Sequence, residues 1–164
     1  MFRYAAIAAA GALTVFGAFQ VLTGPAAHAA ADAPLRGRQG SEPEPARLVK
    51  AADGHYWADG QVNGAPVHFL VDTGASNVSL SLEDARRLGL APSSLVYGQI
   101  VHTASGVGRA ARVRLKSVSV NGVRVADVEA LVIDGGLPAS LLGMSYLGRL
   151  SRFEATPSSL VLNP

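Results

Sequence analysis

Cysteine is absent from this chain of 164 residues. That absence excludes thiol nucleophiles, disulfides and thiolate metal sites together. Charged residues are also scarce, at 16% of the chain with a formal net charge of +2. A broad basic surface that could hold a phosphate backbone is therefore missing, and we expect no nucleic-acid partner. The length suits one domain with an apolar core.

The first residues have the pattern of an export signal. Arg3 precedes an uncharged stretch over residues 4–22, and the small residues Ala27 and Ala29 follow it. A basic start, an apolar stretch and an Ala-x-Ala site are typical of a secretory signal peptide. The uncharged stretch is also close to the length that spans a bilayer. Residues 1–29 are therefore predicted to be a signal peptide cleaved after Ala29, with an inner-membrane anchor as the alternative.

Both alternatives predict an exported protein. A positive charge beside an apolar segment stays on the cytoplasmic side of the membrane, and Arg3 is the charge next to this segment. The remainder of the chain is therefore expected in the periplasm, either free after cleavage or anchored to the inner membrane.

Residues 30–51 are rich in Ala, Pro, Gly, Arg and Glu and poor in large apolar side chains. Such a composition buries too little surface to offset the entropy lost on ordering. This segment is predicted to be a flexible linker, and residues 52–164 are predicted to be the folded domain.

Short valine-rich runs dominate the predicted domain. Gly, Asn and Pro separate these runs, which is typical of a mostly β fold. Asn63-Gly64 and Asn121-Gly122 each stand between two runs. Asn-Gly predicts a β-hairpin, because both residues tolerate positive φ. A further strand pair is predicted in the tail, around Phe153-Glu154 and Leu160–Leu162.

Two short helices are expected within this β pattern. Ser81 is a capping residue, Asp84 is the acid three residues later, and Gly89 is a stop signal. A second helix is expected after Gly143 and to end by Leu150. The predicted fold is therefore all-β with one or two short helices.

Asp72-Thr73-Gly74 closes a strongly apolar run that begins at Val67. An ionised carboxylate is costly to bury unless fixed donors receive it. Small residues at positions 74 and 75 let backbone N–H groups approach that carboxylate closely. The pattern indicates an active-site acid; the alternative is a structural β-domain in which Asp72 only forms a turn.

Two other segments follow this tripeptide along the chain. Thr103-Ala104-Ser105-Gly106 lies in a Gly-rich stretch, and Leu141-Leu142-Gly143 precedes the second predicted helix. Together with the apolar run into Asp72, they resemble the retropepsin-like aspartic peptidases, the single-domain relatives of retroviral protease, and in particular their exported bacterial members. The resemblance covers about residues 53–163 and implies a closed-barrel acid-protease fold.

The resemblance implies an aspartic endopeptidase that is a homodimer. In such a site two carboxylates share a proton, one acting as a base towards water and the other as an acid towards the carbonyl oxygen. This chain has a single Asp-Thr-Gly, so one Asp72 from each subunit would meet at the two-fold axis. Neither a metal nor an organic cofactor is implied.

The resemblance also gives each loop residue a role. Asp72 is the implied catalytic acid/base, and Thr73 would bond across the dimer axis. Gly74 would present its N–H to the carboxylate, and the Ser76 hydroxyl could bond the outer carboxylate oxygen.

A flap and an apolar shelf complete the implied site. The flap would run from about Ile100 to Ala111, close over bound peptide and contact the substrate main chain near its tip. Its substrate-binding residues are predicted to be Thr103, Ala104, Ser105 and Gly106. The shelf beneath the active loop is predicted to be Leu141, Leu142 and Gly143.

Several rival functions are weighed against this interpretation. The domain could be catalytically silent and bind a peptide or an envelope partner. Asp134 could supply a second carboxylate within one chain, but Leu137-Pro138 follows it in place of a Thr-Gly pattern. The stretch 106–111 imitates a dinucleotide fingerprint, yet an alternating strand follows it rather than a helix. His55, His68 and His102 lack the close spacing of metal ligands.

Overall fold

The computed structural model describes residues 44–103 and 106–164. The predicted signal peptide or anchor, most of the predicted linker, and Ala104 and Ser105 of the predicted flap lie outside the described residues. Within the described ranges, no helix is both long and apolar enough to cross a membrane.

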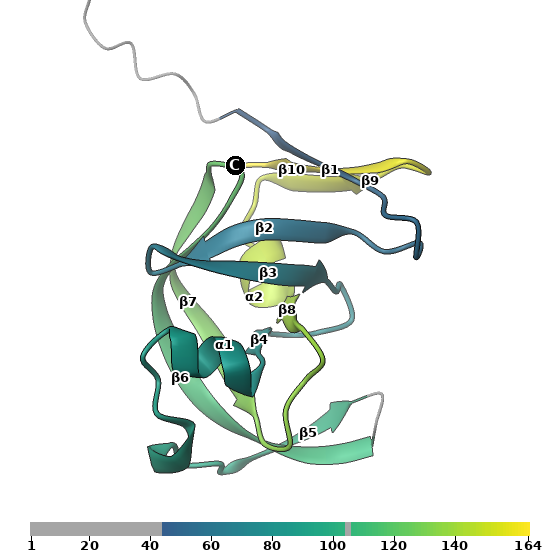
Figure 1. Ribbon diagram of the computed structural model, residues 1–164. Helices are drawn as coiled ribbons and strands as arrows, with labels where there is room; N and C mark the ends of the chain where they lie inside the picture. The colour runs from purple at the N-terminus through teal and green to yellow at the C-terminus, as the bar shows by residue number, and fades with distance from the viewer. Residues whose placement is uncertain (1–43, 104–105) are drawn as a thin grey trace, which may run out of the picture. The chain divides into compact units, whose positions relative to one another are not determined.

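Six strands close into a β-barrel (Figure 1). They follow one another around it in the order β2-β3-β8-β4-β7-β6, and β6 pairs back onto β2. A seventh strand, β5, extends this sheet by pairing with the start of β6. The all-β closed barrel predicted from the sequence is confirmed. The strands of this sheet are β2 Trp57–Val62, β3 Ala65–Val71, β4 Val78–Leu80, β5 Gln99–Thr103, β6 Gly106–Val120, β7 Val123–Ile133 and β8 Ser140–Leu142.

Both predicted Asn-Gly hairpins are confirmed. The first joins β2 to β3 and the second joins β6 to β7. Asn63 and Asn121 have φ angles of 53° and 45°, and the glycine after each has a φ of 90°. Consecutive positive φ angles match the right-handed twist of the flanking strands.

A separate three-stranded sheet has the order β1-β10-β9 (Figure 1). It consists of β1 Ala46–Val49, β9 Arg152–Ala155 and β10 Ser159–Asn163. The predicted pairing of the two tail strands is confirmed. β10 lies in the middle, so strands of the same chain cover both of its edges.

The presence of β1 corrects the predicted start of the domain. The sequence pattern assigns residues 46–49 to the linker, but they pair with β10 along their whole length. Ala46 and Leu48 are only 3% and 4% exposed, whereas Arg47 and Val49 between and after them face outward. This alternation is the strand period, but four residues after a Pro- and Ala-rich stretch are too few for it to stand out.

Two short α-helices and one 3-10 turn connect the strands. The helices are α1 Leu82–Arg87 and α2 Met144–Leu147, and the turn η1 is Pro92–Ser94. The Ser81 Oγ accepts the Asp84 N–H at 3.1 Å, as a capping serine should. Asp84 is itself buried, and its carboxylate accepts hydrogen bonds from the hydroxyls of Ser81 and Ser140 and from the guanidinium of Arg87. These bonds compensate the buried charge and fix α1 to the first residue of β8.

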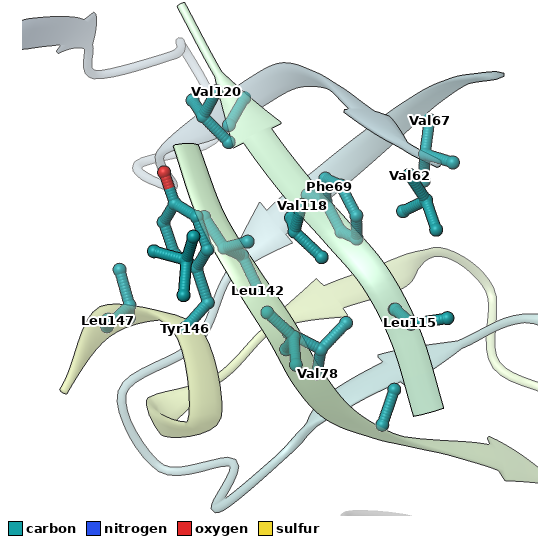
Figure 2. Packing of buried hydrophobic residues seen from close by; sticks show 14 of the residues in the cluster. Val62, Val67, Phe69, Val78, Leu115, Val118, Val120, Leu142, Tyr146 and Leu147 are labelled. Atoms are coloured by element: carbon teal, nitrogen blue, oxygen red, sulfur yellow. The ribbon is translucent and has the colours of Figure 1, made fainter. Parts of the chain in front are cut away.

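The barrel core consists mainly of valine and leucine around two aromatic rings (Figure 2). Phe69 on β3 and Tyr146 on α2 are both fully buried. The Tyr146 hydroxyl donates to the Val123 carbonyl oxygen at 2.9 Å, so its polar tip is satisfied. Burial raises the pKa of Tyr146, so this hydroxyl stays protonated in alkaline solution. Since Leu142 of β8 lies in the same cluster, the core fixes the strand that lies beneath the Asp72 loop.

Candidate active site

The Asp72 loop, residues 72–77, leaves the end of β3 and returns as β4. Strand β8 lies between these two strands and pairs with both. Val71 is in register with Leu142, and the Asp72 N–H donates to the Leu142 carbonyl oxygen at 3.2 Å. The loop therefore begins directly over the predicted shelf, and its position depends on β8.

The Asp72 carboxylate is held by the backbone of its own loop. The Gly74 N–H donates to Asp72 Oδ1 at 2.8 Å, which is the contact that the resemblance assigned to Gly74. The Ala75 N–H donates to the Asp72 carbonyl oxygen at 3.3 Å, which closes the turn. Asp72 is half-buried, whereas Gly74 is exposed. The carboxylate is thus oriented by a fixed donor and stays open to solvent on one side.

The roles predicted for Thr73 and Ser76 remain predictions. Both residues are exposed in the single chain. The resemblance assigns Thr73 to a contact with a second copy, which one chain does not contain. Across residues 44–103 and 106–164, the Ser76 hydroxyl makes no hydrogen bond, to Asp72 or to any other group.

Gly143 allows the shelf to touch the Asp72 loop. A Cβ at this position would lie 2.2 Å from the Asn77 carbonyl oxygen and 2.7 Å from the Ala75 carbonyl oxygen. The next residue donates to the same loop, because the Met144 N–H lies 2.8 Å from the Ala75 oxygen. Leu141-Leu142-Gly143 therefore supports the loop from below, through backbone contacts that only glycine permits at position 143.

Strands β5 and β6 form the hairpin that the resemblance assigned to the flap. Thr103 is in register with Gly106, and the Thr103 hydroxyl donates to the Gly106 carbonyl oxygen at 2.9 Å. Val101 of β5 packs on a small apolar cluster separate from the barrel core. This cluster also contains Ala110, Leu131, Ile133 and Leu137.

The second carboxylate considered from the sequence, Asp134, lies in the turn after β7 rather than in the Asp72 loop. Its N–H donates to the Arg109 carbonyl oxygen at 2.8 Å, which extends the ladder between β6 and β7. Together with Ile100, Val107 and Arg109 it lines an open groove of about 540 Å³ beside the hairpin.

The glycine-rich stretch and the histidines belong to other segments than the Asp72 loop. Residues 106–111, which imitate a dinucleotide fingerprint, belong to strand β6 and precede no helix. His68 bonds Asp59 on the β2–β3 hairpin. Among the described residues, no three His, Asp or Glu side chains group as they would around a metal ion.

Sequence patterns gave no role in the site to Met144 or Ser145, which also position the Asp72 loop. Met144 acts through its backbone N–H, which residue type does not reveal. Ser145 acts through its hydroxyl, but a serine inside a short helix carries no motif.

A closed β-barrel that presents Asp-Thr-Gly over the Leu-Leu-Gly segment has the architecture of a retropepsin-like aspartyl protease domain. Residues 58–149 match the family described as "gag-polyprotein putative aspartyl protease". The chain belongs to this retropepsin-like aspartyl protease family.

Similar proteins agree with that membership. The crystal structure of a retropepsin-like aspartic protease from Rickettsia conorii is similar at a TM-score of 0.67 and 35% sequence identity, over 73% of this chain and 89% of that one. An uncharacterized protein of Rickettsia prowazekii is 38% identical over 116 residues, and one of a Sinorhizobium species is 39% identical over 116 residues. These matches cover 71% and 70% of this chain. The chain spans about half the length of these two curated relatives, 50% in each case.

Proposed function

We propose that the protein is an aspartic endopeptidase whose active site forms when two copies associate. The observation that carries this proposal is the Asp72 carboxylate, which is oriented by the Gly74 N–H and held over β8. The exposed loop residues around it leave room for a second loop, and each chain supplies a single Asp-Thr-Gly. Two loops related by a two-fold axis would supply the pair of carboxylates.

The proposed reaction is hydrolysis of a peptide bond by water. One Asp72 carboxylate removes a proton from a water molecule while the water oxygen attacks the peptide carbonyl carbon. The protonated Asp72 of the other copy donates its proton to the peptide carbonyl oxygen. The Asp72 that took the proton from water then gives it to the amide nitrogen as the C–N bond breaks, and the other Asp72 carboxylate takes a proton back from a hydroxyl of the tetrahedral intermediate. Carboxylic acid and amine products leave, and no covalent bond to the protein forms.

The remaining parts of the site receive roles within this proposal. The β5–β6 hairpin would cover the bound peptide and exclude water, and Leu141 of the shelf would contact its apolar side chains. We also propose that the protein acts in the periplasm, free or anchored by residues 4–22, because the N-terminal pattern predicts export.

The association of two copies has one geometric constraint. β10 already has a partner strand of its own chain on each side, so a second copy could not insert beside it. Among residues 44–103 and 106–164, no strand pairs with the outer edges of β1 and β9. β1 exposes Arg47 and Val49, whereas β9 exposes the ion-paired Arg152 and Glu154. Since β1 presents fewer charged side chains, its edge is favoured as the one that meets the second copy.

Cleavage of a mixed peptide library tests the activity directly. We expect cleavage at internal peptide bonds across part of the pH range, and we expect a transition-state inhibitor of aspartic peptidases to block it. The products are identified by mass spectrometry. Cleavage that resists the inhibitor would contradict the two-carboxylate mechanism, and a folded, dimeric protein that binds library peptides without cutting them would favour a silent binding module.

Hybrid dimers test whether two copies share one site. We expect that co-refolding wild-type chains with nine equivalents of the Asp72→Asn variant lowers activity per wild-type chain to about a tenth, because most wild-type chains then pair with an inactive copy. The matched control is the same excess of Asp59→Asn, an exposed acid on the β2–β3 hairpin, which should leave activity per total chain unchanged. An enzyme that works as a monomer would keep its full activity per wild-type chain in the Asp72→Asn mixture.

A further inference from the structure

Three sets of contacts hold the Asp72 loop to the rest of the chain. The first is at its start, where the Asp72 N–H meets the Leu142 carbonyl. The second is in its middle, where the Met144 N–H meets the Ala75 carbonyl. Both use backbone groups on each side, so many residue types could supply them. The third is at the end of the loop and uses side chains.

Ser145 makes this third contact with both of its hydrogen-bonding functions. Its Oγ accepts the Val78 N–H at 2.9 Å and donates to the Glu129 carbonyl oxygen at 2.7 Å. Val78 is the first residue of β4 and directly follows the loop. The hydroxyl therefore joins the end of the loop to α2 and to β7 at once.

Glu129 also holds Asn77, the residue before Val78. Its Oε1 lies 3.5 Å from Asn77 Nδ2 and 3.0 Å from Arg112 Nη1. Asn77 and Val78 are thus both held to Glu129 of β7. Asn77 bonds the Glu129 carboxylate directly, and Val78 is linked to the Glu129 carbonyl oxygen through Ser145. Arg112 of β6 forms an ion pair with the Glu129 carboxylate, so this side chain is itself held in place.

We propose that Ser145 is a positioning residue for Asp72. Its hydroxyl sets where the loop ends, and the backbone bonds at Leu142 and Ala75 set where the loop starts and turns. Without the hydroxyl, the Val78 N–H loses its acceptor and the end of the loop can shift on β8. The Asp72 carboxylate would then move relative to its counterpart in the second copy, and a displacement of about 1 Å can lower a rate by roughly 100-fold. The inference rests on the proposed peptidase function and names a residue that this function requires.

The experiment compares Ser145→Ala and Ser145→Thr with a control serine. Threonine retains an Oγ that can accept and donate, whereas alanine does not. The control is Ser151→Ala, since Ser151 is exposed and its hydroxyl lies 3.5 Å from the Asn163 carbonyl oxygen, away from the loop. Two readouts are needed: steady-state kinetics on a peptide that the wild-type protein cleaves, and amide hydrogen exchange at Val78.

We expect Ser145→Ala to lower kcat by about 10- to 100-fold with KM within about twofold, because the loss concerns the reacting groups rather than peptide binding. Exchange at the Val78 amide should become about tenfold faster or more, because its hydrogen bond is lost. Ser145→Thr should restore both values, and Ser151→Ala should change neither.

The possible results separate this inference from the proposed function. A wild-type protein without peptidase activity refutes the proposed function, and the exchange data then decide the hydroxyl's role in holding the loop. Unchanged Val78 exchange in Ser145→Ala overturns the inference. So does a kcat that stays at the wild-type value while exchange increases, or a threonine variant that behaves like alanine in both measurements.

Discussion

Replacing Asp72 with asparagine is expected to lower kcat for peptide cleavage by at least about a thousandfold. Asparagine has nearly the shape of aspartate, and its carbonyl oxygen can still accept the Gly74 N–H that holds position 72. It carries no negative charge, so it cannot remove a proton from water. The fold should persist, with a free energy of unfolding within about 0.5 kcal/mol of the wild-type value.

The measurements are kcat on a cleaved peptide and urea unfolding of the same samples. Asp59→Asn is the control, because Asp59 is an exposed acid that bonds His68 outside the Asp72 loop. Peptide cleavage that survives Asp72→Asn at the wild-type rate would refute the proposed mechanism. A variant that unfolds in buffer would instead favour the view that Asp72 is a structural turn residue.

Replacing Gly143 with alanine is expected to cost roughly 3 kcal/mol or more of folding free energy. The added methyl carbon would lie 2.2 Å from the Asn77 carbonyl oxygen and 2.6 Å from the Asn77 carbonyl carbon. Both neighbours are backbone atoms, so no side chain can rotate away. Either the Asp72 loop lifts from β8 or β8 leaves its place between β3 and β4, and activity should fall with stability.

Urea unfolding and peptide cleavage measure the two effects. Gly98→Ala is the matched control, because a Cβ at Gly98 would meet nothing within 4 Å. That control should leave both stability and cleavage close to the wild-type values. A fully stable Gly143→Ala protein would show that the loop does not lie against β8 as described.

The sequence predicted the parts of the fold that local chemistry determines. Asn-Gly requires two positive φ angles, so the turn at Asn63 could be read without knowing the rest of the chain. The cap at Ser81 is likewise local. β1 was missed because its evidence is not local: Ala46 and Leu48 make a strand only when β10, over a hundred residues later, is there to pair with them.

The same distinction applies to the candidate site: contacts within a short motif could be predicted, whereas contacts between distant residues could not. Asp72 and Gly74 lie within one tripeptide, so their contact follows from the motif. The contact between Ser145 and Val78 joins residues 67 positions apart, and serine has many ordinary roles in proteins. Asp84 is a further example: the local pattern predicted an acid near the helix cap, but not that its carboxylate would be buried and accept a hydrogen bond from Ser140, 56 positions later.

The middle position of β10 has a consequence for how the activity would be controlled. Because β10 is paired on both sides by strands of its own chain, this sheet does not require strands of a second copy. If catalysis nevertheless requires two copies, a dilute subunit is intact and idle, and the rate rises with the square of its concentration well below the dissociation constant. Confinement to a membrane surface would then serve as a switch, because crowding in two dimensions raises the frequency of encounters without altering a single atom of the site.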